Sequence, residues 1–149
     1  MEHLDGLVSE ALALTEGVPH LISNLANVSA LLYEKLPCVN WVGFYIAEGK
    51  RLVLGPFQGR PACIEIPFGK GVCGTAAESR KSVLVPDVHE FPGHIACDGR
   101  SRSELVIPVF AGASLFGVLD VDSPEKGRFT EEDREALERL VSLLEKNIF

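Results

Sequence analysis

The spacing of apolar residues changes twice along this chain, and this change most constrains the fold. Apolar residues recur at helical intervals over residues 4–15 and again over 21–36, where Pro37 marks the end of the second stripe. From residue 40 onward the pattern becomes short aromatic and β-branched runs, which are typical of strands. A helical stripe returns after Thr130, whose side chain suits an N-cap ahead of the acids at 131–133.

The sequence therefore predicts helices at both ends of a central group of strands. Strands are expected over residues 40–48, 51–57, 62–68, 82–85, 104–111 and 114–121, with a short helix over 72–80 and a long loop over 86–103. This order indicates an α+β fold, with a mostly antiparallel sheet of about six strands and the N- and C-terminal helices packed on one face. We expect residues 1–149 to form a single domain.

Charge and composition exclude several classes of protein. The net charge is −7, which argues against a surface that binds nucleic acid. No apolar run approaches the ~20 residues of a membrane span, and the first residues contain no secretory signal. We expect a cytoplasmic protein, with no membrane contact, whose four cysteines are reduced thiols, catalytic groups or metal ligands rather than structural disulfides.

The stretch GKGVCG places glycines at the spacing of a dinucleotide-binding loop, at Gly69, Gly71 and Gly74. That fold requires a βαβ unit and an acid about 20 residues further on, whereas this loop follows a strand meander and Asp87 comes only thirteen residues after Gly74. Two other interpretations remain open. The glycines form a tight turn beside a small buried Cys73, or the first turn of a helix lowers the pKa of the Cys73 thiol.

The other cysteines lie apart from one another in the sequence. Cys38 follows the second helix, Cys63 lies near the start of the third strand, and Cys97 lies in the long loop with His89 and His94. Long loops inside compact domains that carry such residues are typical of functional segments. Zinc sites usually contain C-x₂₋₄-C pairs, and since the chain contains none, we expect no metal site.

Several acids and aromatic residues are expected to share one face of the sheet. Asp120 and Asp122 are two apart on one strand, and Trp41 and Tyr45 are four apart on another, so each pair points to one side. Glu104 opens a neighbouring strand. Carboxyl groups held close together raise a pKa, which makes a proton donor available near neutral pH, and they also suit a ligand ammonium group.

Six stretches together resemble the free methionine-(R)-sulfoxide reductases, which are GAF-domain enzymes. In chain order they are NWVGFY, LVLGPFQG, GKGVCG, DVHEFPGHIACD, SELVIPV and GVLDVDSP. The resemblance covers most of residues 39–130, and GHIACD together with GVCG and LGPFQG is its most specific part. It implies a GAF domain with a central antiparallel sheet, a homodimer that packs through terminal helices, and reduction of free L-methionine-(R)-sulfoxide to methionine.

The resemblance also implies a role for individual residues. Cys97 is the expected nucleophile, Cys63 the resolving cysteine, and Cys73 an auxiliary or second resolving thiol. A thioredoxin-type partner would reduce the resulting disulfide, and no bound cofactor is expected. The substrate-pocket positions of the family correspond to Trp41, Tyr45, Glu104, Asp120 and Asp122.

Other interpretations come from the same residues. Many GAF domains are small-ligand sensors without catalysis, but a sensor has no need for three cysteines in these motifs. Cys38 lies outside the motifs and is expected to have no catalytic role. After HIACD the chain reads GRSRSE, where the family has small uncharged residues, and this brings Arg100 and Arg102 close to Cys97 as candidate ligands for a substrate carboxylate.

Overall fold

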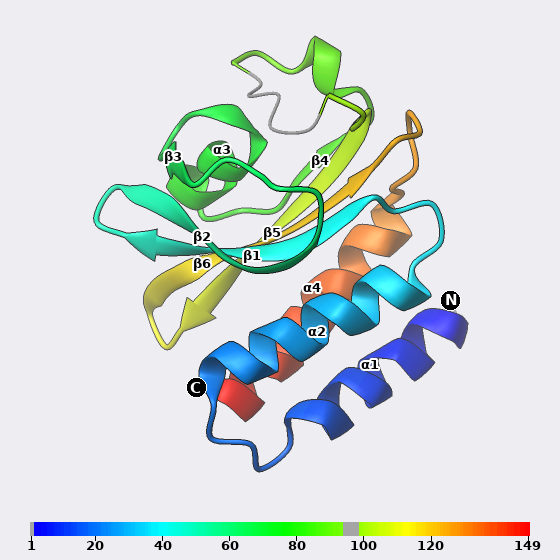
Figure 1. The fold of residues 1–149 in the computed structure, drawn as a ribbon, viewed down its shortest axis with the longest axis vertical. Coiled ribbons are helices and arrows are strands. Elements are labelled where there is room, and N and C mark those ends of the chain that lie inside the picture. Colours follow the sequence, from blue (N-terminus) through cyan, green and yellow to red (C-terminus); the bar gives the residue numbers. More distant parts are fainter. Residues whose placement is uncertain (1, 94–98) are drawn as a thin grey trace.

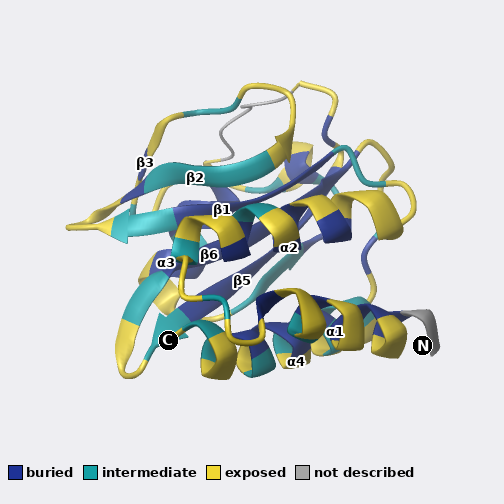
Figure 2. Cartoon of the chain, turned by 60° about the horizontal axis from the view of Figure 1, so that its bottom comes forward, coloured by how far each residue is buried: buried dark blue, intermediate teal, exposed yellow. Residues whose placement is uncertain are grey.

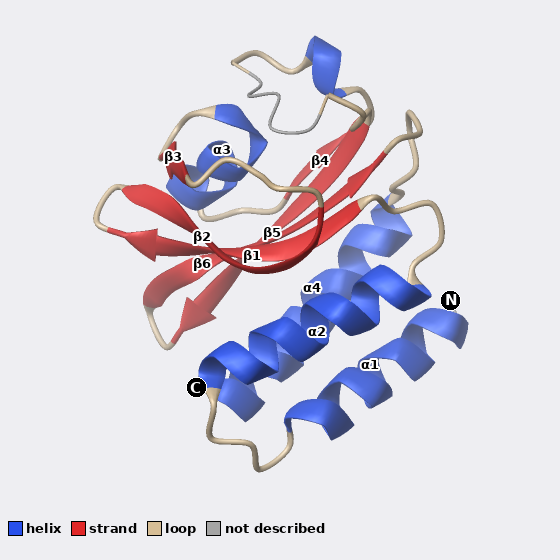
Figure 3. Ribbon diagram, viewed as in Figure 1, coloured by secondary structure: helices blue, strands red, loops and turns tan. Residues whose placement is uncertain are grey.

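A six-stranded antiparallel sheet forms the centre of the molecule (Figures 1 and 3). The computed structural model describes residues 2–93 and 99–149, and within them the strands lie in the order β3-β2-β1-β6-β5-β4. Each hydrogen-bonded pair is antiparallel. The strands are β1 (Trp41–Glu48), β2 (Arg51–Gly59), β3 (Glu65–Pro67), β4 (Val83–Val85), β5 (Ser103–Ala111) and β6 (Ser114–Ser123).

Three helices lie on one side of this sheet, as the sequence predicted (Figure 1). Helix α2 (Leu21–Lys35) packs on β1 and β2, helix α4 (Glu131–Ile148) packs on β5, and helix α1 (Glu2–Thr15) packs on α2 and α4. Figure 2 shows that these helices turn buried sides inward and exposed sides to solvent. Their shared core includes Leu32, Phe44 and Leu119. Helix α4 starts with a capping box in which Thr130 and Asp133 bond each other's backbone N–H groups.

The opposite side of the sheet is covered by the short helix α3 (Gly71–Ser79). Helix α3 follows β3 and precedes β4, and these two strands form the two edges of the sheet. The chain must therefore cross the whole sheet between them, and α3 packs on β5 and β6 during that crossing. A second apolar cluster, which includes Val72, Val106 and Val118, lies between α3 and the sheet. This layer also holds the candidate site residues.

The glycine-rich loop makes the tight turn from β3 into α3. Gly69 and Gly71 have φ of 84° and 62°, which is the left-handed region that glycine tolerates. A Cβ at Gly74 would overlap the carbonyl oxygen of Pro67, so the third glycine allows α3 to approach β3 closely. The dinucleotide interpretation does not fit this geometry, since β3 and β4 are at opposite edges of an antiparallel sheet.

Two segments differ from the sequence prediction. The third strand spans Glu65–Pro67 rather than 62–68, because residues 60–64 form a loop whose carbonyls bond to β1 side chains and to β2. Cys63 therefore lies in this loop and not on a strand. The long loop contains a 3₁₀ turn, Val88–Glu90, capped by the Asp87 carboxylate. None of the helices in the described ranges is both long and apolar enough to cross a membrane.

Candidate active site

Three carboxyl groups meet on the α3 side of the sheet. Glu104 on β5 is directly opposite Asp122 on β6, and Asp120 lies two residues earlier on the same strand. All three side chains are buried, at 7%, 4% and 9% exposure for Glu104, Asp120 and Asp122. Asp120 and Asp122 face away from the α1, α2 and α4 core, whose β6 members are Leu119 and Val121. The prediction that the acids share one face is confirmed.

Burial raises the pKa values of two carboxyl groups in this cluster. The pKa of Glu104 is raised well above its ordinary value by burial, and further by the charges of Asp120 and Asp122. The pKa of Asp120 is also raised by burial, although hydrogen bonds with Glu104, Cys73 and Asp122 lower it in part. Oδ1 of Asp120 is buried and has no hydrogen-bond partner among the described residues. The cluster can therefore hold a proton near neutral pH and still offer a buried acceptor atom.

Cys73 reaches this cluster from the first turn of α3. Its Sγ lies 3.7 Å from Oε2 of Glu104, and the thiol is 4% exposed. Burial raises the pKa of Cys73 well above its ordinary value, and the charges of Asp120, Glu104 and Asp122 raise it further. The interpretation in which the helix terminus lowers the pKa of this thiol is therefore wrong. A buried thiol beside acids cannot ionise easily, whatever the helix dipole contributes.

The same group also contains candidate metal ligands. Donor atoms of Cys73, Glu104 and Asp120 all lie within 4.8 Å of one another, and they are the one such group found in residues 2–93 and 99–149. Binding an ion there would first require deprotonation of both Cys73 and Glu104, whose pKa values are raised by burial. The described residues thus offer a proton store more readily than a metal centre.

Trp41 and Tyr45 form an aromatic wall beside the acids. Both side chains are 2% exposed and belong to the cluster on the α3 side of the sheet. Their rings stack with centroids 5.8 Å apart, and Phe57 stacks on Trp41 at 5.1 Å. Burial raises the pKa of Tyr45, as do the nearby charges, Asp120 first. The Tyr45 hydroxyl is therefore neutral and acts as a hydrogen-bond donor.

Gly43 allows this wall to form, and the sequence analysis missed it. A Cβ on this residue would overlap Cβ of Phe57 and lie 2.8 Å from Cη2 of Trp41. Gly43 is also directly opposite Asp120 on the neighbouring strand. A glycine inside an otherwise bulky strand is a recognised signal of a close approach, so the run WVGFY could have indicated it.

The cysteines have different environments. Cys63 is half-buried beside the aromatic wall and forms a disulfide, whereas Cys38 is an exposed free thiol and Cys73 a buried one. Cys97, with His94 and Asp98, lies outside the described residues. Arg100 and Arg102 have exposed side chains. Of the predicted catalytic and binding residues, the structure thus brings together Cys73, Trp41, Tyr45, Glu104, Asp120 and Asp122, with Cys63 beside them.

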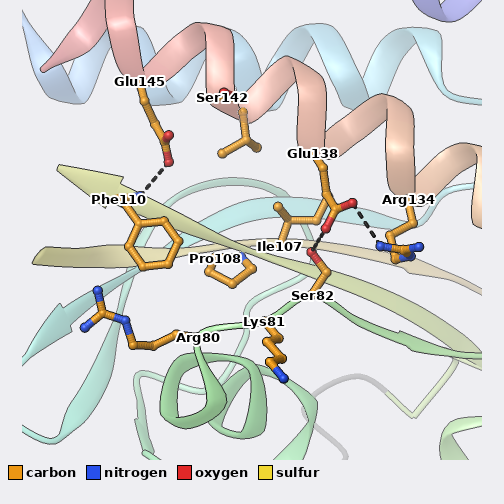
Figure 4. Close-up of a pocket in the computed structure, with 11 residues that line it drawn as sticks. Arg80, Lys81, Ser82, Ile107, Pro108, Phe110, Arg134, Glu138, Ser142 and Glu145 are labelled. Atoms are coloured by element: carbon orange, nitrogen blue, oxygen red, sulfur yellow. Dashed lines mark hydrogen bonds and ion pairs between the residues drawn. The ribbon is translucent and has the colours of Figure 1, made fainter. Parts of the chain in front are cut away.

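A separate hollow lies between β5 and α4, on the other side of the sheet (Figure 4). It has a volume of about 490 Å³ and contains none of the predicted site residues. Its acids already have partners, because Glu145 accepts from the Phe110 N–H at 2.6 Å and Glu138 accepts from Ser82 at 2.7 Å. This hollow therefore lacks unpaired acids for a reaction.

Comparison with known proteins places this architecture in a family. Residues 13–148 match the family described as GAF domain. The free methionine-R-sulfoxide reductase of Escherichia coli (strain K12) is 53% identical over 134 residues, which cover 90% of this chain and 81% of the relative.

Solved structures agree with this result. The free methionine-R-sulfoxide reductase from Neisseria meningitidis, in complex with its substrate, has a TM-score of 0.93 at 41% identity, covering 97% of this chain and 87% of its own. The structure of fRMsr of Staphylococcus aureus in complex with substrate has a TM-score of 0.93 at 49% identity, covering 98% and 95%. The chain belongs to the GAF domain family and, within it, to the free methionine-R-sulfoxide reductases.

Proposed function

We propose that this protein reduces free L-methionine-(R)-sulfoxide to L-methionine by thiol chemistry. The observation that carries the proposal is the buried cluster of Glu104, Asp120 and Cys73, which shares one face of the sheet with the Trp41–Tyr45 wall. Relatives with this activity in their names cover nearly the whole chain. Such a pocket combines an apolar wall, carboxylates and a proton store, which are the groups that a small sulfoxide-bearing amino acid requires.

We assign binding residues separately to the S-methyl group and to the ammonium group of the substrate. The indole ring of Trp41 offers apolar surface to the S-methyl group. The carboxyl groups of Asp120 and Asp122 suit the ammonium group, and the unpaired Oδ1 of Asp120 is a buried acceptor for it. A cation there would favour the ionised forms of these two acids, because an opposite charge lowers the pKa of a carboxyl group.

The first chemical step transfers oxygen from the substrate to sulfur of the protein. The Cys97 thiolate attacks the sulfoxide sulfur and forms a sulfur–sulfur bond, while a carboxyl group of the cluster protonates the sulfoxide oxygen. The hydroxyl group then moves to the sulfur of Cys97 as the sulfur–sulfur bond and the bond from the methionine sulfur to oxygen break, which leaves Cys97 as a sulfenic acid and methionine as a thioether. Methionine gains two electrons and Cys97 loses two. Glu104 is the carboxyl group that we propose as the proton donor, since its pKa is raised well above the ordinary value.

The second step forms a disulfide and releases water. The Cys63 thiol attacks the sulfenic sulfur of Cys97, the S–S bond forms, and the hydroxyl group leaves with the Cys63 proton. Two observations support Cys63 rather than Cys73 in this role. Cys63 is disulfide-bonded in the structure, and Cys73 is free, buried and difficult to ionise. We assign Cys73 an auxiliary role as a protonated neighbour of Glu104.

Repeated turnover requires an external dithiol, because the disulfide of Cys63 must be reduced again before the next cycle. We propose a thioredoxin-type protein, which would exchange its dithiol for the disulfide of Cys63. We also propose a cytoplasmic homodimer that packs through its helices. Exposed apolar residues on α1 and α2, at Leu14, Ile22 and Tyr33, support this arrangement. A light-scattering mass equal to that of one chain would contradict the dimer.

Cysteine variants test these roles under matched conditions. Reduced wild type and Cys38→Ser should both form methionine catalytically with a thioredoxin system, whereas Cys97→Ser should form none. Cys63→Ser should form about one methionine per protein and then stop, since the sulfenic acid has no resolving partner. Normal catalysis by Cys97→Ser would overturn the mechanism. Sustained turnover by Cys63→Ser would transfer the resolving role to Cys73.

A further inference from the structure

The loop that carries Cys63 is irregular and largely exposed, yet it is held at several points. Arg60 and Pro61 are exposed, Ile64 is 69% exposed, and only Ala62 and Cys63 of this segment pack against the apolar cluster on the α3 side. Hydrogen bonds to its backbone carbonyls hold the segment as well. The oxygen of Arg60 accepts from Trp41 Nε1 at 3.1 Å, that of Cys63 from the Tyr45 hydroxyl at 3.0 Å, and that of Ile64 from the Leu54 N–H at 2.8 Å.

The two side-chain donors are themselves rigidly placed. Trp41 and Tyr45 lie on β1, which is hydrogen-bonded to β2 on one side and to β6 on the other. Each ring is 2% exposed, and the two rings stack on each other. Gly59, which leads into the loop, has room for no side chain, since a Cβ there would lie 2.6 Å from Cδ1 of Trp41. The polar tips of both rings are therefore fixed by the sheet.

We propose that Trp41 and Tyr45 are positioning residues for Cys63, in addition to forming the wall of the pocket. Their hydrogen bonds hold loop 60–64 so that the Cys63 sulfur stays beside the pocket in both the thiol and the disulfide states. This inference rests on the proposed function and deepens it. The aromatic wall that we propose for substrate binding would thus also hold the cysteine that completes the reaction, so one structural element would position both the substrate and the resolving thiol.

A Cys63 thiol on a held loop has a higher effective concentration at the sulfenic sulfur than one on a released loop. The held loop therefore favours the disulfide over the dithiol. Tyr45→Phe is the sharpest change, because it deletes one hydroxyl oxygen from a buried side chain. It removes the hydrogen bond to the Cys63 carbonyl oxygen and leaves the aromatic ring in place. Tyr33→Phe is the matched control, since it deletes the same atom from the partly exposed side chain of the other tyrosine, on α2.

The test measures the thiol–disulfide equilibrium of Cys63 in mixtures of reduced and oxidised dithiothreitol. The Cys63 peptide is alkylated and quantified by mass spectrometry. Tyr45→Phe should lower the equilibrium constant for disulfide formation by about three- to tenfold, because the released loop must then lose the conformational freedom of about one more residue when the disulfide forms. Tenfold corresponds to about 30 mV for this two-electron couple. Trp41→Phe, which removes the other donor, should shift the equilibrium in the same direction.

A kinetic measurement separates positioning from substrate binding. In a single turnover, methionine formation reports the first step and loss of the Cys63 thiol reports the second. In Tyr45→Phe the second rate should fall more than the first, and Tyr33→Phe should leave their ratio as in wild type. An unchanged equilibrium constant and an unchanged ratio in Tyr45→Phe would overturn the positioning role. Absence of methionine from wild type would instead overturn the proposed function, and the dithiothreitol equilibrium would still decide the positioning role.

Discussion

The chemistry of the site depends on how three neighbouring residues share their protons. Glu104, Asp120 and Cys73 are each nearly excluded from solvent, and burial is the largest cause of the raised pKa of each. A lone surface acid would be ionised at neutral pH and would have no proton to give. In this enclosed pocket the raised pKa values of Glu104 and Asp120 favour a retained proton, and Glu104 is the carboxylic acid that we propose as the proton donor to the sulfoxide oxygen.

This arrangement has a cost in stability that depends on pH. Glu104 has a higher pKa when folded than when unfolded, so its contribution is fully present at low pH and is lost as pH rises through the folded value. Glu104→Gln, which cannot ionise, should therefore gain stability relative to wild type between about pH 5 and about pH 8. Urea unfolding at both pH values measures the difference.

The control for this prediction is Glu10→Gln, at an exposed position on α1. Its stability relative to wild type should change much less between the two pH values. If Glu104→Gln shows no larger change than Glu10→Gln, the folded protein does not hold the Glu104 carboxyl group in its protonated form.

Among the elements, the short helix α3 places the Cys73 thiol in the site. It is nine residues long, and it carries Cys73 to the acids while it crosses from one edge of the sheet to the other. Its position depends on the close approach of Gly74 to the backbone of β3, where the Gly69 N–H also donates to the Gly74 carbonyl at 2.8 Å. The glycines of this loop thus place a thiol rather than bind a phosphate.

Gly74→Ala tests the placement of this helix. The added methyl group would overlap the Pro67 carbonyl oxygen, so α3 must shift away from β3 and take Cys73 with it. We expect a loss of about 1–3 kcal/mol in the free energy of unfolding, as for other overpacked sites, together with slower methionine formation. Chemical denaturation and single-turnover assays measure the two effects.

Gly6→Ala is the matched control, since Gly6 lies on α1 with nothing within 4 Å of an added Cβ. Alanine in an exposed helix should raise stability by roughly 1 kcal/mol and leave the reaction unchanged. A Gly74→Ala protein as stable and as active as wild type would show that the approach of α3 to β3 is not required.

For the molecule as a whole, the sequence predicted the layers of the fold and the faces of the strands better than the burial and pKa values of single side chains. The alternation of side chains on strands correctly placed Asp120 with Asp122 and Trp41 with Tyr45, because that period is a local property of the chain. Of the two interpretations left open for Cys73, a small buried residue beside a tight turn is confirmed, and a thiol with a lowered pKa is wrong. The pKa of this thiol depends on Glu104 and Asp120, which come from strands far along the chain, and on the burial of the helix against them.

The end of the third strand was also misjudged for a non-local reason. Residues 62–64 have the composition of a strand, but tertiary hydrogen bonds from Tyr45 and from β2 take up the carbonyls of Cys63 and Ile64. Those bonds come from strands outside the segment, so no window around Cys63 could have revealed them. The positioning role of the aromatic wall follows from this same difference between sequence and structure.

The most direct test of the account is the stereochemistry of the reaction. Reduced wild-type protein is mixed with free methionine sulfoxide that is racemic at sulfur, together with dithiothreitol, and the diastereomers are separated by chiral chromatography. The account predicts that the R form at sulfur disappears, that methionine appears in equal amount, and that the S form remains. If neither diastereomer changes while the protein is folded, the central claim is contradicted and the chain is a GAF domain that binds a small ligand without catalysis.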